Sequence, residues 1–114
     1  MLNQVIIVGR LVAKPIVEEN ENGRKVSEIT LAVQRSYKNA EGVYETDFIK
    51  CTLWNGIAEN TAEYCDKGDL VGVKGRLETS VYEKENGEKY RITSVVAEKV
   101  SFLSSGKTEK GEEK

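Results

Sequence analysis

The stretch YETDFIKCTLW, residues 44–54, decides the fold. Successive side chains of a β-strand point to opposite faces, and this stretch has one apolar and one mixed face. The apolar face consists of Ile49, Cys51 and Leu53, and the mixed face of Phe48, Lys50, Thr52 and Trp54. Aromatic rings along a strand with a cation between them suit single-stranded nucleic acid, whose bases stack and whose phosphates need positive charge. The alternative is a strand buried on both faces, and this stretch alone leaves both interpretations open.

The length and composition indicate one domain with a single hydrophobic core in 114 residues. No apolar run reaches the roughly 18 residues of a transmembrane helix, and the first ten residues lack the features of a secretory signal. Cys51 and Cys65 lie in segments expected to be buried, which favours reduced thiols in a cytosolic protein. The formal charge of −2 counts against binding nucleic acid by bulk positive charge, so the placement of the cations must decide.

The first half of the chain predicts two more strands. Residues 4–11 form an apolar run typical of a strand covered on both sides. Residues 14–25 hold the one proline and Asn22-Gly23, which indicates a loop or a short hairpin. Residues 26–37 alternate as a half-buried strand, and residues 39–42 make the turn into the stretch 44–54. The inward side chains of strand 26–37 are Ile29, Leu31 and Val33.

The second half predicts a helix and two further strands. Residues 57–65 follow helical spacing, with Asn55 as the expected N-cap and Gly68 just past the end. Strands follow at 70–82 and 89–103, joined by a hairpin at Asn86-Gly87. Residues 104–114 have no apolar content and are expected to be a disordered tail, which leaves residues 1–103 as the domain. The inward side chains of strand 70–82 are expected to be Val71, Val73, Leu77 and Val81.

Five strands with a short helix between the third and fourth predict an all-β protein, an OB-fold. This fold is a small five-stranded Greek-key barrel that often binds oligonucleotides. Gly9, Gly72 and Gly75 lie inside strand patterns, where a small barrel needs bulges and close bends.

Catalytic and metal-binding signatures are missing from the sequence. There is no histidine, which excludes a Ser-His-Asp or Cys-His nucleophile arrangement. No cysteine spacing fits zinc and no Asp-rich loop fits calcium. Gly106-Lys107-Thr108 imitates the end of a phosphate-binding loop, but Ser101 stands where the leading glycine belongs. We therefore expect no cofactor, no metal and no enzymatic activity.

Several stretches occur in a recognisable order and spacing over about residues 2–103. They are NQVIIVGRL, ITLAVQRSY, DFIKCTLWN, AENTAEYCDKGDLVGVKGRL and VVAEKVSFL, with Pro15 and Asn22-Gly23 after the first. The ordered set resembles the bacterial single-stranded DNA-binding protein family, most closely its short Gram-positive members. The resemblance implies an OB-fold that assembles as a homotetramer with DNA wrapped around it.

The resemblance also implies the residues that contact DNA. Base-stacking rings carry over to Tyr37, Phe48, Trp54 and Tyr82, and phosphate contacts are expected from Arg10, Arg35, Lys50, Lys74 and Arg76, with Lys67 a weaker candidate. Strand parity independently places Phe48, Trp54 and Tyr82 on outward faces. Tyr37 does not follow the parity of its strand, which predicts a bulge or a turn there.

The chain departs from the family pattern in its charges. Glu18-Glu19 replace an Arg-aromatic pair, and Glu78 and Ser80 stand where the family is often basic. Fewer phosphate contacts predict weaker binding and a shallower salt dependence. The chain ends Glu112-Glu113-Lys114 without the acidic, hydrophobic tip that docks replication and repair proteins, so their recruitment is in doubt.

Two functions follow from these patterns. The first is sequence-nonspecific coating and protection of single-stranded DNA in replication, recombination and repair, in the bacterial cytoplasm at the nucleoid. The alternative is a primosomal accessory protein that acts mainly through protein–protein contacts, and an enzyme ranks third. Ile6 and Val8 on the outward side of the first strand offer a self-complementary surface, as a homotetramer requires.

Overall fold

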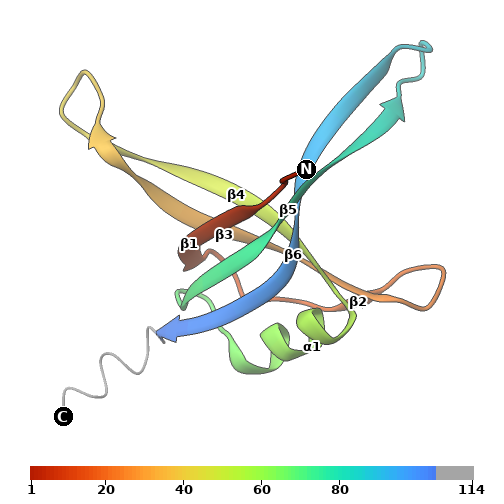
Figure 1. The fold of residues 1–114 in the computed structure, drawn as a ribbon, viewed down its shortest axis with the longest axis horizontal. Coiled ribbons are helices and arrows are strands. Elements are labelled where there is room, and N and C mark those ends of the chain that lie inside the picture. The colour runs from red at the N-terminus through yellow and green to blue at the C-terminus, as the bar shows by residue number, and fades with distance from the viewer. Residues whose placement is uncertain (105–114) are drawn as a thin grey trace.

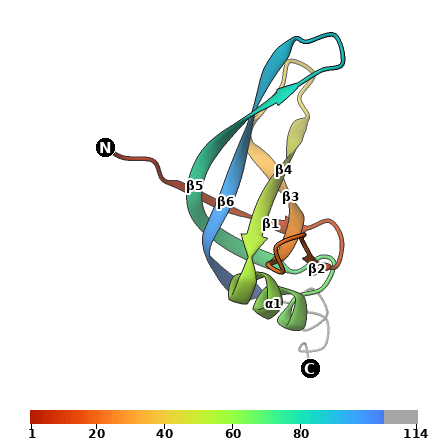
Figure 2. The ribbon, with the colours of Figure 1, turned by 90° about the vertical axis from the view of Figure 1, so that its right-hand side faces the viewer.

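The computed structural model describes residues 1–104, and these fold into five long strands, one two-residue strand and a short helix (Figure 1). The hairpins of residues 25–54 and 70–104 pair along most of their length, and their tips extend outward as two arms (Figures 1 and 2). In chain order the elements are β1 (Val5–Leu11), β2 (Glu18–Glu19), β3 (Lys25–Lys38), β4 (Tyr44–Trp54), α1 (Asn55–Tyr64), β5 (Leu70–Glu83) and β6 (Lys89–Ser104).

The strands close into a barrel, which confirms the predicted OB-fold. The sheet runs β1-β5-β6-β4-β3-β2, and a further β1–β3 pairing at Arg10–Ala32 and Leu11–Leu31 joins its two sides. All of these pairings are antiparallel except β4–β6, which is parallel. Since β2 has only two residues, α1 lies between the third and fourth long strands, as expected.

The alternation predicted for residues 44–54 is present in β4. Cys51 and Leu53 are fully buried in the core and Ile49 packs against it. Phe48 is 66% exposed and Lys50 is also exposed. The alternative of a strand buried on both faces is therefore wrong. Around them the core takes residues from every long strand and from α1: Ile7, Leu11, Ile29, Leu31, Ala58, Cys65, Val71, Val73, Val95 and Ala97.

β5 differs from its predicted pattern beyond the barrel. Val71 and Val73 are buried as expected, whereas Leu77 and Val81 are 45% and 53% exposed. The β1–β5 ladder ends at Gly75, and past it β5 pairs only with β6 in the arm. The period of two therefore continues along a hairpin that no longer has a core beneath it.

β1 is covered on one side only within this chain. Ile7 and Leu11 are buried, while the alternating side chains of Ile6 and Val8 are 70% and 49% exposed. The prediction of a strand covered on both sides is thus wrong for the single chain, although the outward direction of Ile6 and Val8 is as expected. The segment 14–25 forms the short hairpin, with β2 paired to the start of β3.

The ends of α1 differ from the sequence signals. The helix begins at Asn55, which has the left-handed φ of 53° that asparagine tolerates, so Trp54 takes the N-cap position without a side-chain hydrogen bond. Gly68 lies in the turn before β5, where its N–H donates to the Leu11 carbonyl at 2.8 Å, and it does not end the helix. Carbonyl groups at the end of the helix instead accept hydrogen bonds from Lys14, whose Nζ donates to the Ala62 and Cys65 carbonyls at 3.3 and 3.2 Å.

β6 runs one residue past its predicted end, to Ser104. The rest of the predicted disordered tail lies outside the described residues.

Candidate nucleic-acid interface

An open groove of about 530 Å³ lies between the β3–β4 and β5–β6 arms. β4 and β6 pair only at Cys51–Val95 and Thr52–Val96, and from there the two hairpins diverge (Figures 1 and 2). The side chains that line the groove are mostly aromatic, aliphatic or hydroxyl-bearing: Glu28, Phe48, Ile49, Lys50, Thr52, Tyr82, Tyr90, Ile92, Thr93, Ser94 and Val95. Such a surface can take flat apolar groups along its length.

The β4 wall of the groove exposes a ring and a cation because their cross-strand partners are small. Phe48 lies opposite Ala32 on β3, and Lys50 lies opposite Thr30. Neither partner is large enough to cover its neighbour. Lys50 forms no ion pair with any carboxylate among residues 1–104, so its charge is available to a ligand.

The wall formed by β5 and β6 carries a pair of rings, of which the sequence predicted Tyr82 but not Tyr90. Tyr82 lies directly opposite Tyr90 in the β5–β6 ladder, with ring centroids 5.7 Å apart and planes at 30°. Both rings line the groove, and Tyr90 is 41% exposed. The hairpin tip expected at Asn86-Gly87 brings residue 90 near residue 82, but a two-residue turn there would pair residue 82 with residue 91. Tyr90 lies opposite Tyr82 because Lys84 pairs with Glu88 across a loop of three residues.

The two remaining predicted rings lie outside the groove lining. Trp54 has the same strand parity as Phe48 on β4, and the guanidinium carbon of Arg24 lies 4.4 Å from its ring centroid. Tyr37 is 62% exposed on the β3–β4 arm. The β3–β4 register shifts between Gln34 and Lys38, which confirms the irregularity that Tyr37 required.

Two of the predicted phosphate contacts are engaged with carboxylates. Arg35 donates to Asp47 at 2.9 Å and to Glu45 at 2.8 Å. The hydrogen bonds with Asp47 raise the pKa of the Arg35 guanidinium, and they lower the pKa of the Asp47 carboxyl. Arg76 donates to Glu78 at 3.0 Å and to Glu98 at 3.3 Å, which raises its pKa as well.

The other predicted cations lie on the surface away from the groove. Arg10 donates to the Gly68 carbonyl at 3.0 Å, and Lys74 lies opposite Ile6 on the outer face of β5. Lys67 is exposed in the turn before β5. None of these three forms an ion pair within residues 1–104. Of the predicted cations, the structure brings only Lys50 into the groove.

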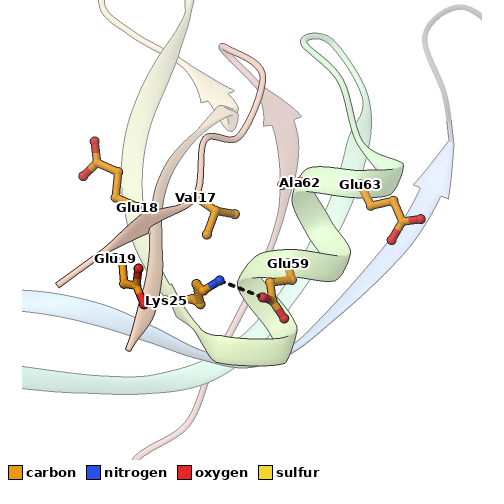
Figure 3. Close-up of a pocket in the computed structure, with 7 residues that line it drawn as sticks. All are labelled: Val17, Glu18, Glu19, Lys25, Glu59, Ala62 and Glu63. Carbon is orange, nitrogen blue, oxygen red and sulfur yellow. Dashed lines mark ion pairs between the residues drawn. The ribbon is translucent and has the colours of Figure 1, made fainter. Parts of the chain in front are cut away.

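A second depression lies between β2 and α1 and is acidic (Figure 3). An ion pair between Lys25 and Glu59, 3.5 Å long, spans it. Glu18, Glu19 and Glu63 also line it, so its net charge is negative and it repels phosphate. The departure from the family pattern at Glu18-Glu19 therefore falls at this depression and not at the groove.

Within residues 1–104, no cluster of acidic, cysteine or histidine side chains has the arrangement of a metal site. No helix in the same part of the chain is long and apolar enough to cross a membrane.

Comparison with known sequences identifies the family to which the chain belongs. The profile of the Single-strand binding protein family matches residues 2–103, which includes the whole barrel, both arms and the groove. The chain belongs to this family.

Curated relatives match over most of the chain. Single-stranded DNA-binding protein B of Bacillus subtilis (strain 168) is 49% identical over 110 residues, which cover 96% of this chain and 97% of that protein. The single-stranded DNA-binding protein of Bacillus cereus is 48% identical over 90% of this chain, but the match spans only 61% of its own length. Single-stranded DNA-binding protein 1 of Lactococcus lactis is 42% identical, over 96% of this chain and 73% of its own.

Proposed function

We propose that this protein binds single-stranded DNA without sequence preference, in the groove between the β3–β4 and β5–β6 arms. The observation that carries the proposal is the set of exposed rings in that groove, Phe48, Tyr82 and Tyr90, with the unpaired charge of Lys50 beside them. Every base has a flat face, so stacking on such rings tolerates any sequence. Membership of the Single-strand binding protein family supports the same ligand.

The proposed contacts divide into stacking and phosphate groups. Bases stack on Phe48, Tyr82 and Tyr90 in the groove, and on Trp54 and Tyr37 beyond its ends. Lys50 is the phosphate contact within the groove. Arg10 and Lys74 contact the part of the DNA strand that continues around the barrel. Arg35 and Arg76 contribute only where a phosphate competes with their carboxylate partners.

This division makes binding depend chiefly on stacking. Few unpaired cations border the groove, and each phosphate neutralised on a single strand contributes about −0.7 to the slope of log affinity against log salt. A shallow salt dependence is therefore expected.

The proposed setting is the replication, recombination and repair of DNA in the bacterial cytoplasm, at the nucleoid. The protein acts there as a binding protein and not as an enzyme. It assembles as a homotetramer, which is supported by the exposed apolar side chains of Ile6 and Val8 on β1. Whether it recruits replication or repair proteins depends on the tail, which lies outside the described residues.

The test is a competition experiment with fluorescently labelled oligo-dT, followed by anisotropy at low salt. Unlabelled single strands of mixed sequence should displace the labelled strand at similar concentrations, because stacking has little base preference. A blunt duplex of the same length should displace it poorly, because its bases are already stacked inside the helix. Equal competition by the duplex, or no binding of oligo-dT, contradicts the proposal.

A further inference from the structure

Arg24 is held over an aromatic ring and not beside a carboxylate of residues 1–104. The guanidinium carbon of Arg24 lies 4.4 Å from the centroid of the Trp54 ring, well within the distance of a cation–π contact. Trp54 is half-buried at the end of β4, and Arg24 stands just before β3, whose Val26 pairs with Trp54. The arginine therefore extends the mixed face of β4 toward the β2–β3 hairpin.

The backbone of Arg24 is fixed by its turn. Its N–H donates to the side-chain oxygen of Asn20 at 2.9 Å, and its carbonyl accepts from the Asn20 N–H at 2.9 Å. Gly23 provides the left-handed residue of this turn, with a φ of 82°. This hydrogen-bonded turn therefore fixes the backbone position from which the Arg24 side chain reaches the Trp54 ring.

Arg24 also differs from two arginines of the arms, Arg35 and Arg76, in its carboxylate partners. It has no ion pair with any carboxylate in residues 1–104, whereas Arg35 and Arg76 each have two carboxylate partners. A guanidinium stacked on a ring keeps the N–H groups of its edge free, and these groups match a phosphate in a bidentate manner.

We propose that Arg24 is a phosphate-contacting residue of the single-stranded DNA site, at its Trp54 end. The inference rests on the proposed function and adds to it a contact in the β2–β3 hairpin. A DNA strand that passes over the Trp54 end of the site meets the guanidinium lying over one face of the ring, with the N–H groups of its edge free to donate to a phosphate. Because the guanidinium already lies against the Trp54 ring in the free protein, less side-chain entropy is lost on binding than for an arginine without such a contact.

The experiment compares the variants R24Q, R24K and K25Q with the unaltered chain. Lys25 is the matched control: it is the next residue, it has the same charge, and its Nζ is directed to Glu59 on α1 (Figure 3). Affinity for fluorescently labelled oligo-dT is measured by anisotropy at several salt concentrations. Circular dichroism melting checks that each variant is folded, and the emission of Trp54 in the free protein reports whether the ring has lost its neighbour.

R24Q should bind more weakly at low salt, and its slope of log affinity against log salt should be shallower by about 0.7, the value for one phosphate on a single strand. Between about 50 and 200 mM salt, its loss of affinity should then be about 2.6-fold smaller than that of the unaltered chain. K25Q should keep the original slope, and R24K should keep it because the positive charge remains.

Three results would overturn the assignment. The first is an unchanged slope in R24Q, even with weaker binding, since Arg24 would then only support the ring. The second is the same decrease in K25Q, which would reflect net charge alone. The third is a decrease in R24K equal to that in R24Q, since the effect would then not follow the charge. An unaltered chain that fails to bind oligo-dT at low salt would instead contradict the proposed function itself.

Discussion

At the scale of single residues, neighbours decide what an aromatic side chain can do. Phe48 and Tyr64 are exposed to nearly the same extent, 66% and 65%. Phe48 lies in the groove with Lys50 on the same strand face, whereas Tyr64 ends α1 and contacts Phe102 with ring centroids 6.0 Å apart. Exposure alone therefore does not distinguish the two rings; the neighbouring cation and the second wall of rings favour Phe48 as the proposed stacking platform.

Phe48→Ala should weaken binding of oligo-dT by about 1–3 kcal/mol, because one stacked base is lost. Stability should change little, since the ring is exposed in the unbound protein. Anisotropy titration gives the affinity and thermal melting the stability. Tyr64→Ala serves as the control and should leave the affinity unchanged; equal losses in the two variants would place DNA elsewhere on the surface.

The buried thiol of Cys51 makes stability depend on alkaline pH. Burial raises the pKa of Cys51 to about 11 from its usual value of 9.0. The folded state thus holds the proton more tightly, so its stabilising effect is complete below pH 9 and is lost as pH rises toward 11. From about pH 8 to pH 10.5, the free energy of unfolding should fall by about 2 kcal/mol more in the unaltered chain than in Cys51→Ala. Urea unfolding at both values measures this, and parallel curves for the two proteins would refute it.

Some residue contacts were predictable from the sequence and others were not. The parity of β4 was predictable, because alternation of side chains is a local property of a strand. The ion pairs of Arg35 were not, since they depend on Glu45 and Asp47 lying across the β3–β4 ladder. The contact of Arg24 with Trp54 also joins distant parts of the chain, the β2–β3 turn and the end of β4, and no spacing in the sequence indicates it.

At the scale of elements, β5 and β6 combine a barrel wall and a free arm in the same strands. The ladder register shifts between Lys74 and Gly75, beside the point where β1 ends its pairing with β5. The close approach at this place requires a glycine: a Cβ on Gly75 would overlap the Val96 carbonyl oxygen. Gly75 therefore positions the arm that holds Tyr82.

Gly75→Ala should destabilise the fold by more than about 2 kcal/mol, because backbone atoms of β6 must move to admit the methyl group. Gly72→Ala is the matched control in the same strand. Its added Cβ would lie 3.6 Å from Leu103 Cδ1, an ordinary contact, so its cost should stay below about 1 kcal/mol. Urea unfolding compares them, and a Gly75 variant as stable as the Gly72 variant would contradict this role of the bulge.

The existence and order of the elements were predictable, but their relation to the core was not. Turn residues and hydrophobic periods were sufficient to place every long strand within a few residues. The same period could not show that Leu77 and Val81 extend past the barrel, because alternation continues wherever a hairpin continues. The start of α1 was obscured because Asn55 adopts a left-handed conformation in place of the expected cap.

At the scale of the whole molecule, charge and apolar surface are separated. The depression between β2 and α1 is lined by four glutamates and one lysine, whereas the lining of the groove between the arms holds one cation, Lys50, and one carboxylate, Glu28. The formal charge of −2 therefore does not describe the face proposed to bind DNA. A further apolar surface remains at β1, where Ile6 and Val8 are exposed.

Ile6→Lys should convert the proposed homotetramer into smaller species, because a charge on β1 would be buried between subunits. Light scattering should give four times 12.7 kDa for the unaltered chain and a lower mass for the variant. Ile16→Lys is the control, since Ile16 is equally exposed at 70% but lies in the loop before β2. A mass of 12.7 kDa for the unaltered chain would reject the tetramer.

The binding of single-stranded DNA by stacking is tested most directly through Trp54, the only tryptophan of the chain. Oligo-dT is titrated into the protein at low salt while the emission of Trp54 is followed. Stacking of a base on the indole predicts saturable quenching, which duplex DNA of the same length should not produce. Emission that stays constant through the whole titration at low salt would contradict the account.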